Sequence, residues 1–122
     1  MRLIMISGPY TGRTAEETED NIEKARLKAL EVISKKGRFD WFPITPHLNT
    51  GRFEMYDFCM EGIRSDYYYN GYTELVQRCQ AILMLPDWKE SKGAIEEHSL
   101  AKAHNIPIYY DVDSIPEVSY DN

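Results

Sequence analysis

Leu3-Ile4-Met5-Ile6-Ser7-Gly8-Pro9 is the stretch that decides the fold. A short apolar run that ends in Gly-Pro is typical of a buried strand, which we expect over residues 3–7. Residues 81–85 have the same character, and shorter strands are expected over residues 39–44 and 106–110. Helical patterns separate these runs. Strands that alternate with helices predict an α/β protein, a Rossmann-like or flavodoxin-like three-layer sandwich with a mostly parallel sheet of four to five strands.

The first helix is expected to begin at a capping box, Thr14-Ala15-Glu16-Glu17, in which the threonine caps the helix and the last glutamate reaches back. Gly37 is its expected C-terminal stop. A 3.6-residue period predicts its buried face, which comprises Ile22, Ala25, Ala29, Leu30 and Ile33. Further helices are expected between residues 71 and 80 and between residues 91 and 104. Residues 49–70 are interpreted as a partly helical excursion with a lid role, and the tail from Asp111 as peripheral or packed on a partner subunit.

The composition fits a single domain over residues 1–122. The formal net charge of −6 argues against a duplex nucleic-acid binder, because neutralising phosphates requires a surplus of lysine and arginine. A small phosphorylated ligand is compatible with it. The longest apolar run is too short for a membrane span, and the N-terminus is too short for a signal-peptide core. Cys59 and Cys79 lack metal-ligand spacing, so we interpret them as reduced thiols and expect a cytoplasmic protein without a metal or cofactor.

The predicted topology places a ligand site beyond the carboxyl ends of the parallel strands. The loops there are residues 8–13, 46–50 and 86–93. In the first loop, Gly8 and Gly12 allow the backbone to approach a ligand, and Arg13 offers donors to a phosphate or carboxylate. The spacing matches neither a Walker A loop nor a dinucleotide fingerprint. The alternative interpretation is a tight turn with a surface arginine.

A carboxylate between two small residues marks the last helical segment. Ala94, Glu97 and Ala101 recur at intervals of three and four residues, so they share one helical stripe. Large neighbours would block the carboxylate, whereas alanines let it point into a cleft. Ser91 is a good N-cap, and Gly93 leaves room for a ligand near the first amides. The alternative is a solvated glutamate on a helix whose alanines pack on the sheet.

Together these segments resemble the nucleoside 2-deoxyribosyltransferase superfamily, and most of all a small branch found in phages and bacteria. The resemblance rests on Ser-Gly-Pro-x-x-Gly after the first strand, Pro46-His47 after the second, and Cys79-Gln80-Ala81-Ile82 followed by Trp88-x-x-Ser91-x-Gly93-Ala94-x-x-Glu97-x-x-x-Ala101. It covers residues 4–110, and residues 91–101 are its most specific part. Members have a Rossmann-like sheet and act on the N-glycosidic bond of deoxynucleosides or their 5′-monophosphates.

The resemblance implies roles for individual side chains. Glu97 matches the family's nucleophile, which in its ionised form stabilises positive charge on the sugar and captures C1′ as an ester. We expect its place in the early turns of a helix to favour that ionised form. Ser91 matches a position that holds the sugar or its 5′-phosphate, and serine there, together with Arg13, favours a nucleoside monophosphate. A homodimer or higher homo-oligomer is also implied, in which a neighbour's residues close the site.

This chain differs from the family pattern at three positions. Met5 stands where the family has tyrosine, and Tyr72 and Gln80 each stand where it has aspartate. The aspartate that Tyr72 replaces assists proton transfer to the leaving base. Asp66 from the preceding loop is the candidate substitute, and a water held by Asp87 is another. Tyr10 or Tyr72 is the candidate to hold Glu97 by a hydrogen bond.

Aromatic residues offer surfaces for a base. The four tyrosines within residues 67–72 can stack on it, and their alternative is an interface between subunits. Trp88 has similar alternatives, and His47 can contact a base or be an ordinary turn residue. The predicted binding residues are Gly8, Pro9, Tyr10, Gly12, Arg13, His47, Asp87, Trp88, Ser91 and Gly93, and the predicted catalytic residues are Glu97 and Asp66.

We therefore expect an enzyme, an N-glycosidase or deoxyribosyltransferase acting on a deoxynucleoside or its 5′-monophosphate through Glu97. The expected partner is a small nucleoside or nucleotide, with no nucleic acid and no membrane. The departures at Met5, Tyr72 and Gln80 motivate the alternative, a nucleotide-binding or sequestering protein of the same fold without turnover.

Overall fold

The computed structural model describes residues 1–59, 61–64 and 66–118, with the backbone alone described over 57–59. Its strands are β1 (Arg2–Ser7), β2 (Trp41–Ile44), β3 (Ala81–Met84) and β4 (Ile108–Tyr109). Its helices are α1 (Ala15–Lys36), α2 (Pro46–Asn49), α3 (Tyr67–Gln77) and α4 (Lys92–Ala103). Short 3-10 turns are η1 (Gly37–Phe39), η2 (Phe53–Cys59), η3 (Trp88–Glu90) and η4 (Val112–Ser114).

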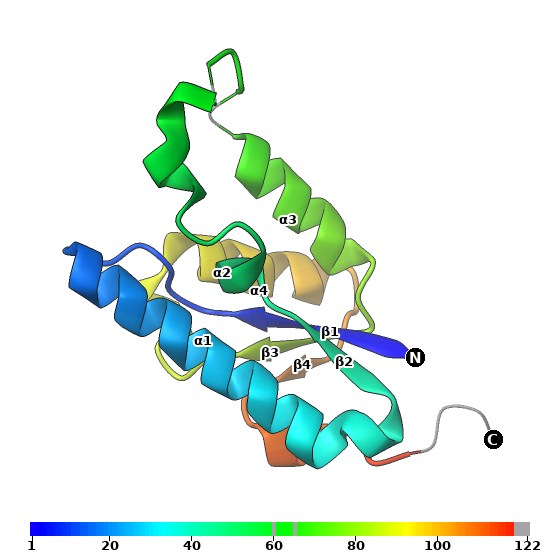
Figure 1. Cartoon of the computed structure of the whole chain (residues 1–122). Coiled ribbons are helices and arrows are strands. Elements are labelled where there is room, and N and C mark those ends of the chain that lie inside the picture. Colours follow the sequence, from blue (N-terminus) through cyan, green and yellow to red (C-terminus); the bar gives the residue numbers. More distant parts are fainter. Residues whose placement is uncertain (60, 65, 119–122) are drawn as a thin grey trace.

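The four strands of the described residues form one parallel sheet in the order β2-β1-β3-β4. One buried cluster joins the sheet to α1, and another joins its opposite face to α3 and α4, as Figure 1 shows. The protein is therefore an α/β sandwich of the Rossmann-like, flavodoxin-like type, and the predicted fold class is confirmed. The strand order reverses direction at β1 and β3, which is where such sheets bind ligands.

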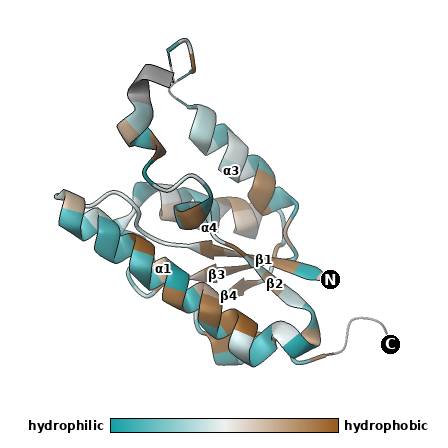
Figure 2. Ribbon diagram, viewed as in Figure 1, coloured by the Kyte–Doolittle hydropathy of each residue, from teal (hydrophilic) through white to brown (hydrophobic). Residues whose placement is uncertain are grey.

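β1 contributes to both halves of the core, because successive side chains of a strand point to opposite faces. Ile4 and Ile6 pack in the cluster on the α1 side, and Met5 packs in the cluster on the α3 and α4 side. Figure 2 shows brown, hydrophobic residues in the strands, whereas hydrophilic and hydrophobic residues alternate along α1. Met5 is thus a core residue. Ser7 follows it in the same register, so the last residue of β1 faces α4.

The ends of α1 agree with the prediction, apart from the second half of the capping box. The Thr14 side chain accepts a hydrogen bond from the N–H of Glu17 at 3.0 Å, and Gly37 is the C-cap. The Glu17 carboxylate lies 3.5 Å from the Arg13 guanidinium and pairs with it along the helix.

The inner face of α1 differs from the prediction at two positions. Its buried residues are Thr18, Asn21, Ile22, Ala25, Ala29, Val32 and Lys36. Leu30 and Ile33 are 53% and 50% exposed, so their predicted burial is wrong. Each follows a buried residue by one position, which turns it about 100° round the helix axis and toward solvent. Leu27 is exposed as well, and we call these three residues the α1 apolar stripe.

Residues 50–59, 61–64 and 66 follow α2 and lie away from the sheet before the chain returns through α3 (Figure 1). We call this segment the excursion. α3 begins at Tyr67, earlier than predicted, so the tyrosine-rich segment forms its first turns. Asp66 occupies the N-cap position, but its carboxylate binds the Arg64 guanidinium rather than a helix amide. Cys79, after α3, is a buried free thiol, whereas the side chain of Cys59 lies outside the described residues.

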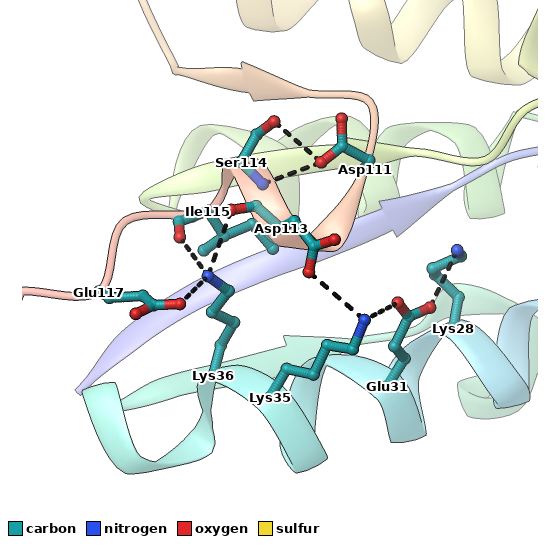
Figure 3. Close-up of polar contacts among 9 residues, drawn as sticks. All are labelled: Lys28, Glu31, Lys35, Lys36, Asp111, Asp113, Ser114, Ile115 and Glu117. Atoms are coloured by element: carbon teal, nitrogen blue, oxygen red, sulfur yellow. Dashed lines mark hydrogen bonds and ion pairs between the residues drawn. The ribbon is translucent and has the colours of Figure 1, made fainter.

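The segment after β4 packs on the chain's own core, so its expected peripheral position is wrong for residues 111–118. Val112 and Ile115 are buried in the cluster on the α1 side. Lys36, the last residue of α1, donates from Nζ to the Ile115 carbonyl oxygen at 2.8 Å and to the Glu117 carboxylate at 2.8 Å (Figure 3). In the described part of the chain, no helix combines the length and apolarity needed to cross a bilayer.

Candidate functional site

The strand order creates a crevice at the carboxyl ends of β1 and β3. The loop after β1 leads to α1 on one face of the sheet, and the loop after β3 leads to α4 on the other. A cavity of about 610 Å³ lies at this point and is also bounded by α2, the excursion and α3. The predicted site residues that line it are Gly8, Pro9, Tyr10, His47, Ser91, Gly93 and Glu97.

Glu97 is held at the cavity by Ser7. The Ser7 hydroxyl donates a hydrogen bond to Glu97 Oε1 at 2.5 Å, a contact that joins the end of β1 to α4. Ala94 and Ala101 lie one turn away on either side and are buried in the core. The small alanines therefore pack on the sheet, as the alternative interpretation proposed, while the glutamate between them is turned toward the cavity rather than to bulk solvent. The bond from Ser7 occupies one carboxylate oxygen and leaves Oε2 to a ligand.

Burial dominates the electrostatics of Glu97. It raises the pKa of the carboxyl to about 7; the hydrogen bond from Ser7 opposes this rise, and the charge of Glu96 adds to it. The expected help from the helix N-terminus is weak, because Glu97 is in the second turn of α4 and the dipole effect fades beyond the first. Both the ionised and the protonated forms of the carboxyl are therefore populated near pH 7. Burial and the charge of Glu97 also raise the pKa of the Cys79 thiol to about 11, which makes it a poor nucleophile.

Ser7 is a residue that the sequence reasoning missed. The Tyr10 hydroxyl donates to the Glu54 carboxylate at 2.8 Å and accepts from the Arg52 N–H at 2.6 Å, and the Tyr72 hydroxyl bonds to Thr50 Oγ1 at 2.7 Å. These bonds tie the excursion to the first loop and to α3, and Ser7 takes the predicted role of the tyrosines. A hydroxyl at the end of an otherwise apolar strand, in register with Met5, was the available signal.

Gly8 and Gly12 of the first loop are packed so closely against neighbouring residues that a side chain would not fit. A Cβ on Gly8 would lie 2.5 Å from Leu85 Cδ1, and one on Gly12 would lie 2.5 Å from Glu17 Cβ. Gly12 does not line the cavity; its N–H donates to Thr18 Oγ1 at 2.8 Å. Gly93 differs, since the nearest atom to a Cβ there is Ser91 Oγ at 3.9 Å. Open space at the start of α4 agrees with the predicted room for a ligand.

Four further predicted residues do not line the cavity. Arg13 projects into solvent with 92% of its side chain exposed. Asp66 is exposed and bound to Arg64 at 3.0 Å, so the structure does not bring it to Glu97 as a proton donor. Asp87 lies 3.8 Å from the Lys24 ammonium. Trp88 stacks on His98 with the ring centroids 4.2 Å apart, which turns its face to a neighbouring side chain rather than to a base.

The excursion supplies two cavity residues that the sequence analysis did not single out, Phe53 and Glu54. Thr50 and Lys92, which also line the cavity, lie in two of the loops that were expected to form the site. The aromatic wall, by which we mean Tyr10, Phe53, Tyr68, Tyr69 and Tyr72, brings five rings to the cavity. This wall agrees with the predicted stacking surface for the tyrosines at 68, 69 and 72. Tyr67 lies outside it.

Comparison with known families adds one finding. Residues 2–110 match the family described as Domain of unknown function (DUF4406). The chain belongs to this family. The DUF4406 match spans the four strands and every residue named above as lining the cavity. No curated protein matches this DUF4406 chain. Among its described residues, no group of three histidine, cysteine, aspartate or glutamate side chains is arranged to hold a metal ion.

Proposed function

We propose that this DUF4406 protein cleaves or transfers at the N-glycosidic bond of a deoxynucleoside or its 5′-monophosphate, with Glu97 as the nucleophile. The observation that carries the proposal is a glutamate bonded by Ser7 through one oxygen, on the wall of a cavity of about 610 Å³. A cavity of this volume is of the size that takes a small organic ligand. The resemblance of residues 91–101 to the deoxyribosyltransferase pattern supports the same assignment of Glu97.

The chemistry divides into two steps. First, the C1′–N bond breaks, its electron pair leaves with the base, and a Glu97 oxygen bonds to C1′ as an ester. Then water, or an N–H nitrogen of a second base, attacks C1′, the ester C–O bond breaks and Glu97 returns as a carboxylate. The attacking group loses one proton, and the departed base anion takes up one proton, so the overall reaction balances. Only the ionised carboxylate can attack, so the rate should rise with pH through the pKa of Glu97, about 7. Ser7 steadies one oxygen while the other reacts.

The cavity lining offers groups for both the base and the phosphate of a nucleotide. Rings of the aromatic wall can stack on the leaving base, and their hydroxyl groups can hydrogen-bond its edge. Ser91, Lys92 and Gly93 form the start of α4, where main-chain amides and the Lys92 ammonium favour an anion such as a 5′-phosphate. Arg13 and Asp66 do not line the cavity, so the proposal assigns them no role.

Binding without turnover is the alternative. Two observations favour it: burial raises the pKa of Glu97 and so favours its protonated, non-nucleophilic form, and Asp66 does not line the cavity. A binding protein would be stabilised by nucleotides in proportion to their concentration and would release no base.

The deciding experiment incubates the protein with the four deoxynucleosides and their 5′-monophosphates, with and without an acceptor base, and measures free and transferred base by chromatography. Wild type should release or exchange a base. Glu97→Gln, which retains an oxygen for the Ser7 hydrogen bond, should lower that rate by at least about 10³-fold. Glu96→Gln on the same helix is the matched control and should remain active. Nucleotide binding without products in wild type would establish the alternative, and full activity in Glu97→Gln would refute the nucleophile.

The α1 apolar stripe supports self-association of this chain. We propose that Leu27, Leu30 and Ile33 pack against the same residues of a second copy, with the two α1 helices antiparallel. These three side chains are 57%, 53% and 50% exposed and recur at intervals of three residues, so they present one continuous apolar strip on the outside of α1. Sedimentation should show a dimer that Leu30→Glu dissociates. A monomeric wild type at tens of micromolar would contradict the proposal.

A further inference from the structure

His47 has one nitrogen that the fold uses and one that it does not. The residue is on α2, is only 4% exposed, and lines the cavity. Its Nε2 lies 2.8 Å from the carbonyl oxygen of Pro9. A carbonyl oxygen only accepts hydrogen bonds, so Nε2 carries a proton and donates it. Pro9 is two residues beyond Ser7, and this bond therefore fixes the imidazole next to the loop that follows the serine holding Glu97.

The second nitrogen is left as an acceptor. Burial lowers the pKa of His47 below its ordinary value of 6.5, with the backbone of Pro9, the backbone of Gly8 and the charge of Asp87 opposing the shift, so the neutral ring predominates at pH 7. A neutral imidazole with its proton on Nε2 has a bare lone pair on Nδ1. In the described part of the chain, Nδ1 is buried and has no hydrogen-bond partner. An unsatisfied buried acceptor costs about 1–3 kcal/mol, and folded proteins rarely leave one without a donor.

We propose that His47 is a specificity-determining residue whose Nδ1 accepts a hydrogen bond from the 3′-hydroxyl of the substrate's deoxyribose. This inference rests on the proposed function. If Glu97 reacts at C1′, the groups beside Ser7 and Pro9 meet the sugar, while the base extends to the aromatic wall. Ser7 and Pro9 are separated by two residues, at most about 7 Å of extended chain, which is within the span of one furanose and its substituents. The ring of a 2′-deoxynucleoside 5′-monophosphate carries a single hydroxyl, on C3′, and that hydroxyl is the donor the sugar offers.

Two variants separate the roles of the two nitrogens. His47→Gln places an amide N–H near the position of Nε2, so it keeps the bond to Pro9 and loses the acceptor. His47→Asn places an amide oxygen near Nδ1, so it keeps an acceptor and loses the bond to Pro9. The substrates are 2′-deoxynucleoside 5′-monophosphates and their 2′,3′-dideoxy counterparts, which differ only in the hydroxyl at issue.

Wild type should prefer the deoxy over the dideoxy substrate by roughly tenfold or more in kcat/KM. His47→Gln should bring this ratio close to one, by losing activity on the deoxy substrate alone, and His47→Asn should retain part of the preference. Equal losses on both substrates in His47→Gln, or a wild-type ratio near one, would overturn the inference and leave the proposed function standing. If His47→Gln instead lowers kcat/KM only for substrates whose base carries an amino group, Nδ1 contacts the base, and the inference is overturned as well.

Thermal stabilisation by the same nucleotide pairs gives a readout that does not require turnover. A preference for the deoxy nucleotide that disappears in His47→Gln would support the hydroxyl contact even in a protein that only binds. If no nucleotide stabilises wild type and none is turned over, the proposed function and this inference fail together.

Discussion

Replacing Glu97 with glutamine should make the protein more stable than wild type at pH 8, although it removes the proposed nucleophile. In the unfolded chain this carboxyl has a pKa near 4.5, and in the folded protein its pKa is about 7. The folded state therefore holds a proton that the unfolded state has released, and stability falls as the pH rises from 4.5 to 7. At about 1.4 kcal/mol per pH unit, this gap amounts to about 3 kcal/mol, all of it present below pH 4.5 and lost above pH 7.

Glutamine does not titrate, so the unfolding free energy of the Glu97→Gln variant lacks this contribution to the pH dependence. Urea unfolding of both proteins from pH 4.5 to pH 8.5 should give a difference in unfolding free energy that changes by about 3 kcal/mol across the range, in favour of Glu97→Gln at the alkaline end. Taking the difference cancels the other titrating groups, His47 included. Glu96→Gln is the control: it should keep most of the wild-type pH dependence, reduced only by the part of the Glu97 pKa shift that the charge of Glu96 contributes. Parallel curves for wild type and Glu97→Gln would show that the carboxyl is not buried as described, and the reasoning about its chemistry would fail with it.

Three other substitutions test the surroundings of the cavity. Ser7→Ala removes a bond that lowers the pKa of Glu97, so the midpoint of the pH–rate profile should move up by about one unit; an unchanged midpoint would contradict the role of Ser7. Gly8→Ala should cost about 1–3 kcal/mol in thermal unfolding, because its Cβ would lie 2.5 Å from Leu85 Cδ1, whereas Gly93→Ala should cost nothing; equal effects would refute the packing argument. Lys36→Met should lower the unfolding free energy by about 2–3 kcal/mol, because the Ile115 carbonyl loses its donor, and Glu117→Gln should change it by less than about 1 kcal/mol; the reverse order would mean that the surface ion pair matters more than the buried carbonyl contact.

The order of strands and helices could be predicted because each buried strand is an apolar run that ends at a turn residue. Residues 3–7 and 81–85 are such runs, and their parallel pairing follows from the helices between them. The residues at which the strands and helices begin and end were harder to predict. β4 is shorter than its apolar run, and α3 starts before the run of apolar residues on which its prediction rested. The inner face of α1 was misjudged because Leu30 and Ile33 are as apolar as the residues that are buried.

The candidate site could be located to the loops after β1 and β3, and Glu97 could be singled out from its alanine neighbours. Ser7 escaped because a serine at a strand end is ordinary by itself; its meaning appears only when α4 is packed against the sheet. The contribution of Phe53 and Glu54 depends on how the excursion folds back over the crevice, and such a path is set by tertiary contacts rather than by local periodicity. For the same reason, Arg13 looked suited to a phosphate but points away from the cavity.

The buried ammonium of Lys36 sets where the folded unit ends. The family match stops at residue 110. Lys36 Nζ, at the end of α1, donates hydrogen bonds to the carbonyl oxygens of Asp113 and Ile115 and to the Glu117 carboxylate, all of which lie beyond that boundary. A fragment that ended at residue 110 would keep every residue that lines the cavity. It would lose the core residues Val112 and Ile115 and would leave the buried Lys36 ammonium without these acceptors. The folded unit therefore extends past the matched boundary and includes residues 112–117.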